Sequence, residues 1–327
     1  MMPQLIDSHG RILNYLRFSV IDKCNLRCRY CMPADGIDWI KQDELATTDE
    51  CLRMLEIFHR CGITKVRFTG GEPFIRKDFQ EILLRISREK WFEQIHVTTN
   101  GTLGAEVISS LPRGLINGIN LSLDSLQRES YRAITRRDAL PEVMRFFHLL
   151  QSLEIPTKIN MVVIAGMNDH EILDMAQWAK YHPIEVRFIE EMPFNGTGLY
   201  SPTLWDFIKI KETLLAEFPH MKELPFGTGD TAQRYQVEGF KGVFGIIAAW
   251  SRNFCGQCNR IRLTATGQIR TCLYAHSGYS MLAGIRSGKS DEDLIQMLQT
   301  VVMKKAKDGV VAEQNESQHP SMAHIGG

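Results

Sequence analysis

Short apolar, β-branched runs alternate with amphipathic stretches along most of this chain, starting at residue 16. Alternating apolar and polar positions predict strands, whereas a spacing of three and four residues predicts helices. Six strand-then-helix units in a row predict a parallel sheet with right-handed crossovers, and a closed barrel would need eight. We therefore expect an α/β fold, an incomplete (β/α)6 barrel. The expected strands are 16–21, 65–70, 94–99, 119–124, 157–164 and 185–192, and the expected helices are 48–61, 78–90, 105–111, 126–134, 141–153 and 169–181.

Polar and glycine-rich stretches follow several of these strands. TGGEP occupies 69–73, TTNG occupies 98–101 and SLD occupies 122–124. Each stretch taken alone is also an ordinary turn signal, because Gly, Pro, Asn and Asp dominate turns. Ligands of parallel sheets bind at the carboxyl ends of the strands, and all three stretches lie there. Their shared location predicts a functional site at this face.

The loop CNLRCRYCMP directly after the first strand holds Cys24, Cys28 and Cys31. A structural zinc site is closed by four ligands, and a disulfide cannot use three cysteines. An iron–sulfur cube held by three thiolates keeps one iron open for another ligand. The alternative is that the three cysteines pack as small buried hydrophobes. The tight spacing favours the cluster.

A second group, Cys255, Cys258 and Cys272, has the spacing C-x2-C-x13-C. His276 could complete a zinc site, so zinc remains an alternative. A second set of three thiolates in the same chain instead suggests a second cluster with an open iron.

Arg260 and Arg262 alternate along the strand expected after Cys258, so both side chains should point to the same side, beside this cluster. Two guanidinium groups on one face suit a phosphate-bearing ligand. For Arg262 alone, a solvated strand face is the competing interpretation.

The length, composition and net charge of the chain argue against several classes of protein. The 327 residues are 44% hydrophobic, which suits a globular chain with a sizeable core, and 38 basic residues balance 38 acidic ones. A net charge of zero argues against a broad nucleic-acid or membrane-surface binder, but allows a local basic pocket. We expect no membrane partner, because no apolar run approaches the roughly 20 residues that span a bilayer. The N-terminus lacks a signal-peptide core.

The eight cysteines fall in two groups of three, with Cys51 and Cys61 apart in a helical stretch where we expect them to be buried. Grouped cysteines in a chain without an export signal indicate metal sites in a reducing compartment, so we expect a cytoplasmic protein. The composition changes near 193, where PFNGTGLYSP is rich in turn-forming residues. We expect one domain at 1–195 and a C-terminal α+β region at 196–327, with helices at 204–218 and 291–307 and hairpins within 227–251.

CNLRCRYCMP, together with GGEP at 70–73 and the partial barrel, resembles the radical S-adenosylmethionine (SAM) enzymes. The chain resembles one of their families more specifically, the GTP 3′,8-cyclases, which begin molybdenum cofactor biosynthesis. The likeness covers essentially the whole chain and rests on DSHGR, RFTGGEP, VTTN, NLSLD, RFIEEMP, CNRIRLTATGQIRTCL and the terminal Gly-Gly.

The resemblance implies a role for each matching position. Two [4Fe–4S] clusters are implied. The first would be held by Cys24, Cys28 and Cys31 and would bind SAM at its open iron. The second would be held by Cys255, Cys258 and Cys272 and would bind the guanine end of GTP. The SAM pocket would include Tyr30, Gly70, Gly71, Glu72, Ser122 and Met192. The GTP-binding residues would be Arg17, Arg67, Thr98, Lys158, Asn160, Arg187, Arg260, Ile261, Arg262, Gly326 and Gly327. Gly70 and Gly71 would bring backbone close to the methionine moiety, where a Cβ would clash.

The implied reaction is that of a lyase with no catalytic side chain beyond the cofactor and cluster ligands. A 5′-deoxyadenosyl radical would take the C3′ hydrogen of GTP, and the C3′ radical would attack C8, giving 3′,8-cyclo-7,8-dihydro-GTP after reduction. A one-electron donor such as flavodoxin or ferredoxin and a downstream cyclic pyranopterin monophosphate synthase are the implied partners, with a homodimer left open and no nucleic acid. Two alternatives remain, a peptide-modifying radical SAM maturase with an auxiliary cluster and a zinc-stabilised protein without catalysis.

Overall fold

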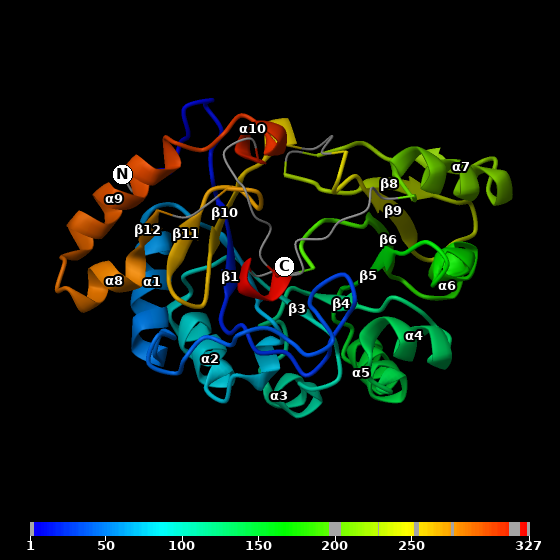
Figure 1. The fold of residues 1–327 in the computed structure, drawn as a ribbon, viewed down its shortest axis with the longest axis horizontal. Coiled ribbons are helices and arrows are strands. Elements are labelled where there is room, and N and C mark those ends of the chain that lie inside the picture. The colour runs from blue at the N-terminus through cyan, green and yellow to red at the C-terminus, as the bar shows by residue number, and fades with distance from the viewer. Residues whose placement is uncertain are drawn as a thin grey trace.

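The computed structural model describes residues 3–195, 204–227, 229–251, 255–275, 278–313 and 321–325. Six parallel strands form its centre, and each lies within two residues of its expected start and end: β1 Tyr15–Ser19, β2 Lys65–Thr69, β3 Gln94–Thr99, β4 Gly118–Ser122, β5 Thr157–Val163 and β6 Glu185–Glu190. The helices that cross between them are α1 Thr48–Arg60, α2 Phe79–Glu89, α3 Ala105–Ser110, α4 Arg128–Thr135, α5 Leu140–Ser152 and α6 Ile172–Tyr181. The incomplete (β/α)6 barrel is confirmed (Figure 1).

The C-terminal region continues the same sheet on both sides. β9 (Val243–Ile247) pairs in parallel with β6, and β10 (Arg260–Leu263) pairs in parallel with β1. The order across the sheet is β12-β11-β10-β1-β2-β3-β4-β5-β6-β9-β8-β7, so its two edges do not meet. The outer strands are β7 Lys222–Glu223, β8 Gln233–Gln236, β11 Gln268–Arg270 and β12 Tyr279–Ser280. The antiparallel β8–β9 pair confirms a hairpin in 227–251.

The remaining helices are α7 Phe207–Glu217, α8 Met281–Arg286, α9 Asp291–Val302, α10 Gly309–Glu313 and α11 Met322–Ile325. The helix expected at 291–307 ends early, at Val302, and a turn follows it. Because the sheet is continuous, the division at residue 195 into two domains stays a prediction. Across the described ranges, no helix combines the length and the apolar content that crossing a bilayer requires.

The strands have two different faces. Leu16 and Phe18 of β1 are fully buried in the core that packs the sheet against its helices. The alternate residue Arg17 lines a cavity on the inner side. Strands buried on both faces are usually apolar throughout, so a polar inner face marks the inside of the barrel as a binding site.

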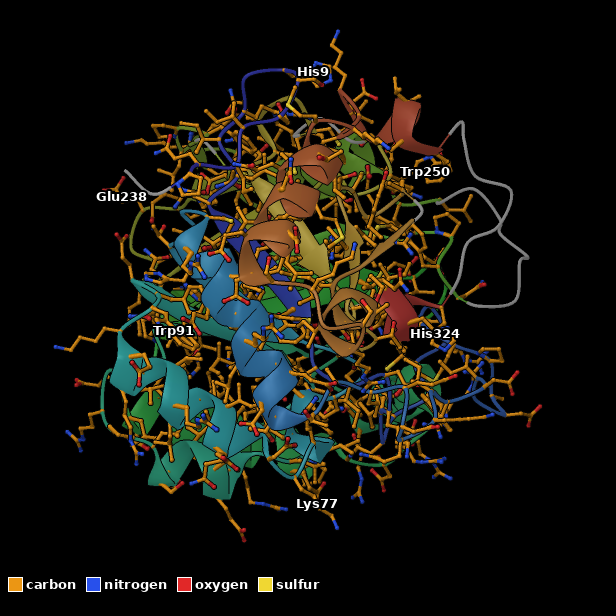
Figure 2. The ribbon with its side chains drawn as sticks, turned by 90° about the vertical axis from the view of Figure 1, so that its left-hand side faces the viewer. His9, Lys77, Trp91, Glu238, Trp250 and His324 are labelled. Atoms are coloured by element: carbon orange, nitrogen blue, oxygen red, sulfur yellow. The ribbon has the colours of Figure 1, made fainter. Side chains whose placement is uncertain are left out.

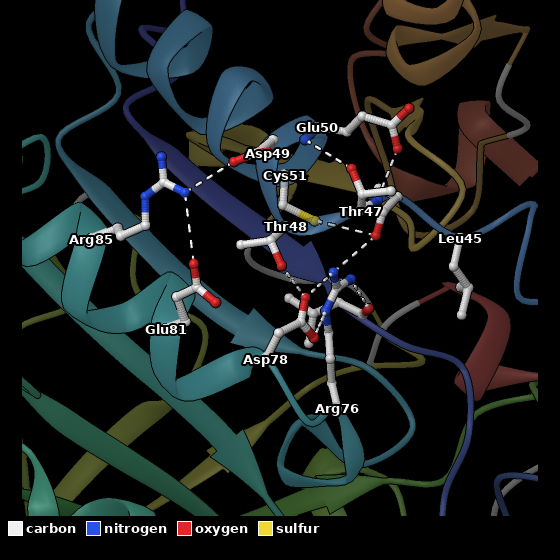
Figure 3. Close-up of polar contacts among 12 residues, drawn as sticks. Leu45, Thr47, Thr48, Asp49, Glu50, Cys51, Arg76, Asp78, Glu81 and Arg85 are labelled. Carbon is white, nitrogen blue, oxygen red and sulfur yellow. Dashed lines mark hydrogen bonds and ion pairs between the residues drawn. The ribbon is translucent and has the colours of Figure 1, made fainter.

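The start of α1 is tied to the ends of two neighbouring segments (Figure 3). Thr47 and Glu50 form a reciprocal capping box, with the Thr47 amide donating to Glu50 Oε2 at 2.8 Å. Arg76 makes two parallel hydrogen bonds to Asp78, at 2.9 and 2.8 Å, and also donates to the carbonyls of Val20 and Ala46. Cys51 is fully buried at this junction and Cys61 is fully buried at the other end of α1, as expected.

Candidate active site

The first three cysteines line a cavity at the carboxyl ends of the strands. It holds about 1000 Å³ of empty space, mouth included, which is the size of a cofactor pocket. Its expected lining residues are Cys24, Cys28, Tyr30, Cys31, Gly70, Gly71, Thr98, Ser122, Asn160 and Met192. The SAM-pocket positions therefore come together, with one exception. Glu72 does not line the cavity and is fully buried beside it.

The cysteine loop is fixed in place by α4. The amides of Arg27 and Arg29 donate to carbonyls at the C-terminal end of this helix, at 3.0 Å each. The Arg136 guanidinium reaches back to the carbonyls of Arg27 and Met32, at 2.7 and 3.0 Å. A loop held from both sides keeps its three thiols in place before any ligand arrives.

Gly70 and Gly71 are required for a reason that differs from the expected one. A Cβ on Gly70 would lie 2.3 Å from the Ile21 carbonyl oxygen, and a Cβ on Gly71 would lie 2.2 Å from that of Asp22. The Gly71 amide donates to the Ile21 carbonyl at 2.7 Å. The close approach is thus to the backbone that begins the cysteine loop. These glycines dock that loop onto the end of β2, and their contact with a ligand stays a prediction.

Buried carboxyl groups stiffen the cavity wall. Glu72 accepts hydrogen bonds from the Thr99 hydroxyl at 2.8 Å and the Asn100 amide at 2.7 Å, and burial raises the pKa of Glu72 to about 7. Tyr30 donates to Asp124 at 2.9 Å, and burial raises the pKa of Asp124 to about 6. Glu72 therefore joins the loop after β3 to the GGEP turn, and Asp124 orients the Tyr30 ring.

The first three thiols are protonated at neutral pH when no metal is bound. Burial raises the pKa of Cys24 to about 11 and that of Cys31 to about 12, and it raises that of Cys28 well above its ordinary value. These thiols keep their protons until a metal displaces them, so cluster assembly here releases protons. The free thiols, their shared cavity and the braced loop all fit a cluster.

A second cavity, with about 990 Å³ of empty space including its mouth, lies on the side of β10 and β6. Its lining includes Cys255, Cys258, Cys272, Arg17, Asn160, Arg187, Arg260 and Arg262. The prediction that Arg260 and Arg262 face the same side is confirmed. Burial would raise the pKa of the Cys258 thiol, but the Arg260 guanidinium and the Lys305 ammonium lower it to about 6.

The second group of cysteines fits a cluster better than zinc. Over the described ranges, no three or more His, Cys, Asp or Glu side chains gather tightly enough to hold one metal ion. A zinc ion needs its ligands around one point, whereas each thiolate of a cluster binds a different iron. His276, the alternative fourth zinc ligand, lies outside the described residues.

Among the described residues, polar atoms in the cationic wall of the second cavity, and directly behind it at Arg67, lack partners. Arg17 Nε, Arg67 Nη1 and Asn160 Oδ1 are buried and have no hydrogen-bond partner within the described part of the chain. Burial and the neighbouring guanidinium groups of Arg17 and Arg260 lower the pKa of Arg262 to about 9. Crowded, desolvated cations with unused donors are stabilised by a polyanion, so this wall fits a phosphate-bearing ligand.

Lys158 and Ile261 do not line either cavity. The Lys158 ammonium pairs with Glu185 at 2.8 Å, and Glu185 also pairs with Arg187 at 2.6 Å. Burial would raise the pKa of Glu185, but Arg187 and Lys158 lower it to about 2. Ile261 is fully buried in the hydrophobic core between Arg260 and Arg262. A direct contact of Lys158 or Ile261 with GTP stays a prediction.

Tyr15 lies among the cations beneath the second cavity. Its hydroxyl accepts a hydrogen bond from Arg67 Nε at 2.5 Å, and the Lys65 ammonium lies 5.0 Å from its ring centroid. Burial would raise the pKa of Tyr15, but Arg67, Arg17 and Lys65 lower it to about 7. Arg67 therefore lies behind the residues that line the cavity, where it donates to the Tyr15 hydroxyl.

The two cavities meet at a common wall formed by Asn160, Ile189, Met192 and Met322. Met322 belongs to α11, which crosses the barrel mouth near the C-terminus (Figure 1). Ser321 donates to the Cys31 carbonyl at 2.8 Å, and His324 contacts the Asp38 carbonyl at 3.1 Å. Figure 2 shows His324 and Trp250 on this side, and Trp91 on the opposite one. Gly326 and Gly327 lie outside the described residues, so their role stays a prediction.

Several site residues were missed in the sequence, among them Asn120, which lines the second cavity, and Tyr15, Glu185, Met322 and Lys305. The alternation of residues along a strand could have indicated three of them. Tyr15, Asn120 and Glu185 occupy strand positions that alternate with buried apolar residues. Met322 and Lys305 lie in turns and short helices, where periodicity predicts nothing.

Comparison with known proteins identifies the family. A family model for the radical SAM superfamily matches residues 18–179, and a model named Molybdenum Cofactor Synthesis C matches residues 184–310. The GTP 3′,8-cyclase of Desulforamulus reducens is 38% identical, with 92% of this chain aligned to 94% of that protein. The mitochondrial GTP 3′,8-cyclase of Arabidopsis thaliana is 35% identical over 99% of this chain and 83% of that protein. The chain belongs to the GTP 3′,8-cyclase family.

Some relatives in the family are longer proteins. Molybdenum cofactor biosynthesis protein 1 of Drosophila melanogaster is 38% identical, with 93% of this chain covering 54% of that protein. The human protein of the same name is 37% identical, with 48% of its length covered. The chain thus spans about half the length of these relatives.

Solved structures share the fold at low sequence identity. The Streptococcus suis enzyme SuiB matches 93% of this chain and 73% of its own, with a TM-score of 0.62 and 14% identity. The enzyme anSMEcpe matches 95% of this chain and 93% of its own, with a TM-score of 0.58 and 14% identity. Membership of the radical SAM superfamily makes SAM and iron–sulfur clusters the cofactors of this family.

Proposed function

We propose that this chain converts GTP to 3′,8-cyclo-7,8-dihydro-GTP in the first step of molybdenum cofactor biosynthesis. The observation that carries the proposal is the pair of three-cysteine cavities that meet at one wall, with four arginines lining the second cavity only. One cavity suits SAM and the other suits a nucleoside triphosphate. The family relatives that bear the name GTP 3′,8-cyclase support the same substrate.

In the first cavity, Cys24, Cys28 and Cys31 would hold the cluster that binds SAM. When this cluster and SAM are bound and one electron is supplied, they provide the 5′-deoxyadenosyl radical that removes the C3′ hydrogen of GTP. The remaining task of the protein is to position SAM and GTP. Tyr30, held by Asp124, would pack beside the cofactor, and Gly70, Gly71, Ser122 and Met192 would complete its pocket, with Glu72 buried behind its wall.

In the second cavity, Cys255, Cys258 and Cys272 would hold the second cluster, at the guanine end of GTP. Arg17, Arg187, Arg260 and Arg262 would grip the triphosphate. Arg67 and Lys158 would lie behind them, and Thr98 lines the first cavity. Asn160 lies on the common wall, so its unpartnered Oδ1 would accept a hydrogen bond from the ribose, close to the C3′ that reacts. Excluding water between the cavities would protect the radical from side reactions.

The partners of the reaction follow from the electrons that it consumes and from its product. Each turnover needs two electrons and one proton, because one electron cleaves SAM and a second electron, with a proton, reduces the cyclised nucleotide radical. A one-electron donor such as flavodoxin or ferredoxin is therefore proposed, in the cytoplasm. The cyclised nucleotide must then be rearranged, which is the task of a cyclic pyranopterin monophosphate synthase. A homodimer stays a prediction.

The test is anaerobic turnover. Reconstituted protein would be mixed with dithionite, SAM and GTP, and the products read by mass spectrometry. We expect 5′-deoxyadenosine and a cyclised GTP isomer together. If 5′-deoxyadenosine forms without a GTP product, the radical function survives and the substrate is wrong, which would favour a peptide-modifying enzyme. If neither forms in protein that carries both clusters, the proposal fails.

Matched cysteine variants sharpen this test. Cys24→Ala should abolish SAM cleavage, whereas Cys255→Ala should impair GTP cyclisation more than SAM binding. Cys61→Ala is the control, because Cys61 is buried in the core away from both cavities and should retain turnover. A Cys24→Ala enzyme that still cleaves SAM would contradict the placement of the first cluster.

A further inference from the structure

Lys305 is a buried lysine in the turn after α9. It is only 3% exposed, although lysines are almost never fully buried unless they are paired. Its ammonium donates hydrogen bonds to two backbone carbonyls, that of Arg260 at 3.1 Å and that of Thr271. The neighbouring Lys304 is exposed and donates to the Tyr279 hydroxyl instead.

The two hydrogen bonds bring no opposite charge to Lys305. Both acceptors are neutral carbonyls, and no carboxylate within the described residues lies at ion-pair distance from its Nζ. Burying an ammonium group without an opposite charge is unfavourable. A buried cation held in this way is stabilised by a nearby anion, and the thiol groups of the second cavity, alone or with a bound cluster, are the groups that can supply one.

The two carbonyls identify where that anion lies. Arg260 follows Cys258 by two residues, and Thr271 directly precedes Cys272. Arg260 and Thr271 both line the second cavity together with its three cysteines. Lys305 is therefore held against the two backbone segments that carry the cysteines of that cavity.

A four-iron cluster with three thiolate ligands carries net negative charge, and it becomes more negative when it is reduced. Nearby positive charge and hydrogen bonding are among the factors that set the reduction potential of such clusters. We propose that Lys305 is the buried counter-charge of the second cluster and raises its reduction potential by stabilising the reduced state. The inference rests on the second cluster of the proposed function.

A purely structural role makes a different prediction. If Lys305 only bridged the segments at β10 and before Cys272, a neutral hydrogen-bond donor would replace it. Lys305→Gln keeps a donor and removes the charge, whereas Lys305→Arg keeps both. Lys304→Gln removes a charge from the adjacent, exposed position and serves as the matched control.

The experiment is a redox titration of both clusters followed by electron paramagnetic resonance, with iron and sulfide content measured for each reconstituted protein. The wild-type protein must first show two clusters. If the wild-type protein holds a single cluster, the assignment of a second cluster is wrong. This result is distinct from one in which both clusters are present and Lys305 has no effect on the second.

In Lys305→Gln we expect the midpoint of the second cluster to move to a more negative potential while that of the first stays unchanged. Lys305→Arg should restore the midpoint, and Lys304→Gln should match the wild type. Loss of the second cluster in the Gln variant but not in the Arg variant would also support a required charge. An unchanged midpoint in Lys305→Gln, or loss of the cluster in both Lys305 variants, would overturn the proposal.

Discussion

Tyr15 shows how single residues acquire their properties from the barrel interior. A buried phenol ordinarily titrates above its value in water, because burial disfavours the charged form. Here the hydrogen bond from Arg67 and the nearby charges of Arg17 and Lys65 outweigh burial and lower the pKa of Tyr15 to about 7. The deprotonated phenol is thus a local counter-charge to these cations.

Tyr15→Phe tests this role through the pH dependence of stability. The folded-state pKa of about 7 lies below the ordinary tyrosine pKa of about 10, so the phenolate contributes stability that is complete above the unfolded pKa. That contribution is lost as the pH falls toward 7. The free energy of unfolding of the wild type should therefore increase relative to that of Tyr15→Phe as the pH rises from 7 to 10. Denaturant unfolding at several pH values measures this, and parallel curves for the two proteins would refute the lowered pKa.

At the scale of the element, the start of α1 depends on a junction and not on helix propensity alone. The Thr47–Glu50 capping box satisfies local amide donors. Arg76 then ties this end to the end of β1, because the same guanidinium reaches Asp78, the Val20 carbonyl and the Ala46 carbonyl (Figure 3). Val20 precedes the cysteine loop by a few residues, so the junction also supports the first cavity.

Arg76→Lys should weaken this junction. A lysine has one donor group and cannot serve Asp78 and two carbonyls with the same planar geometry. We expect a loss of about 2 kcal/mol in the free energy of unfolding, since hydrogen bonds to charged groups contribute about 1.5–3 kcal/mol each. Arg85→Lys is the control, because Arg85 is 47% exposed in its pair with Asp49 and should cost under about 0.5 kcal/mol. Equal losses in the two variants, measured by chemical denaturation, would contradict a special role for Arg76.

At the scale of the whole molecule, the C-terminal region completes the barrel on both sides. β9 covers the edge of β6, and β10 covers the edge of β1. Without them, β1 and β6 would expose their backbone donors and acceptors to solvent, a known route to aggregation. The second cysteine group reaches the cavity because it lies next to β10.

A fragment of residues 1–195 should therefore fail to behave as an independent domain. We expect it to aggregate, or to lack a cooperative unfolding transition, whereas the full chain remains soluble under the same conditions. Size-exclusion chromatography and thermal unfolding followed by circular dichroism would measure this. A monomeric fragment with a cooperative transition would show that the barrel folds alone, and would support the boundary expected at 195.

Local features of the sequence determined the order of strands and helices, the turns at the strand ends and the two groups of cysteines, because periodicity and loop position act over a few residues. The tertiary structure decided which of these features meet. The parallel pairing of β10 with β1 places Arg260 and Arg262 beside Arg17. It also decided the Glu185 ion pairs and the burial of Lys305 against two distant carbonyls. Charges and desolvation depend on distances in space between residues far apart in the chain, and no local pattern encodes those distances.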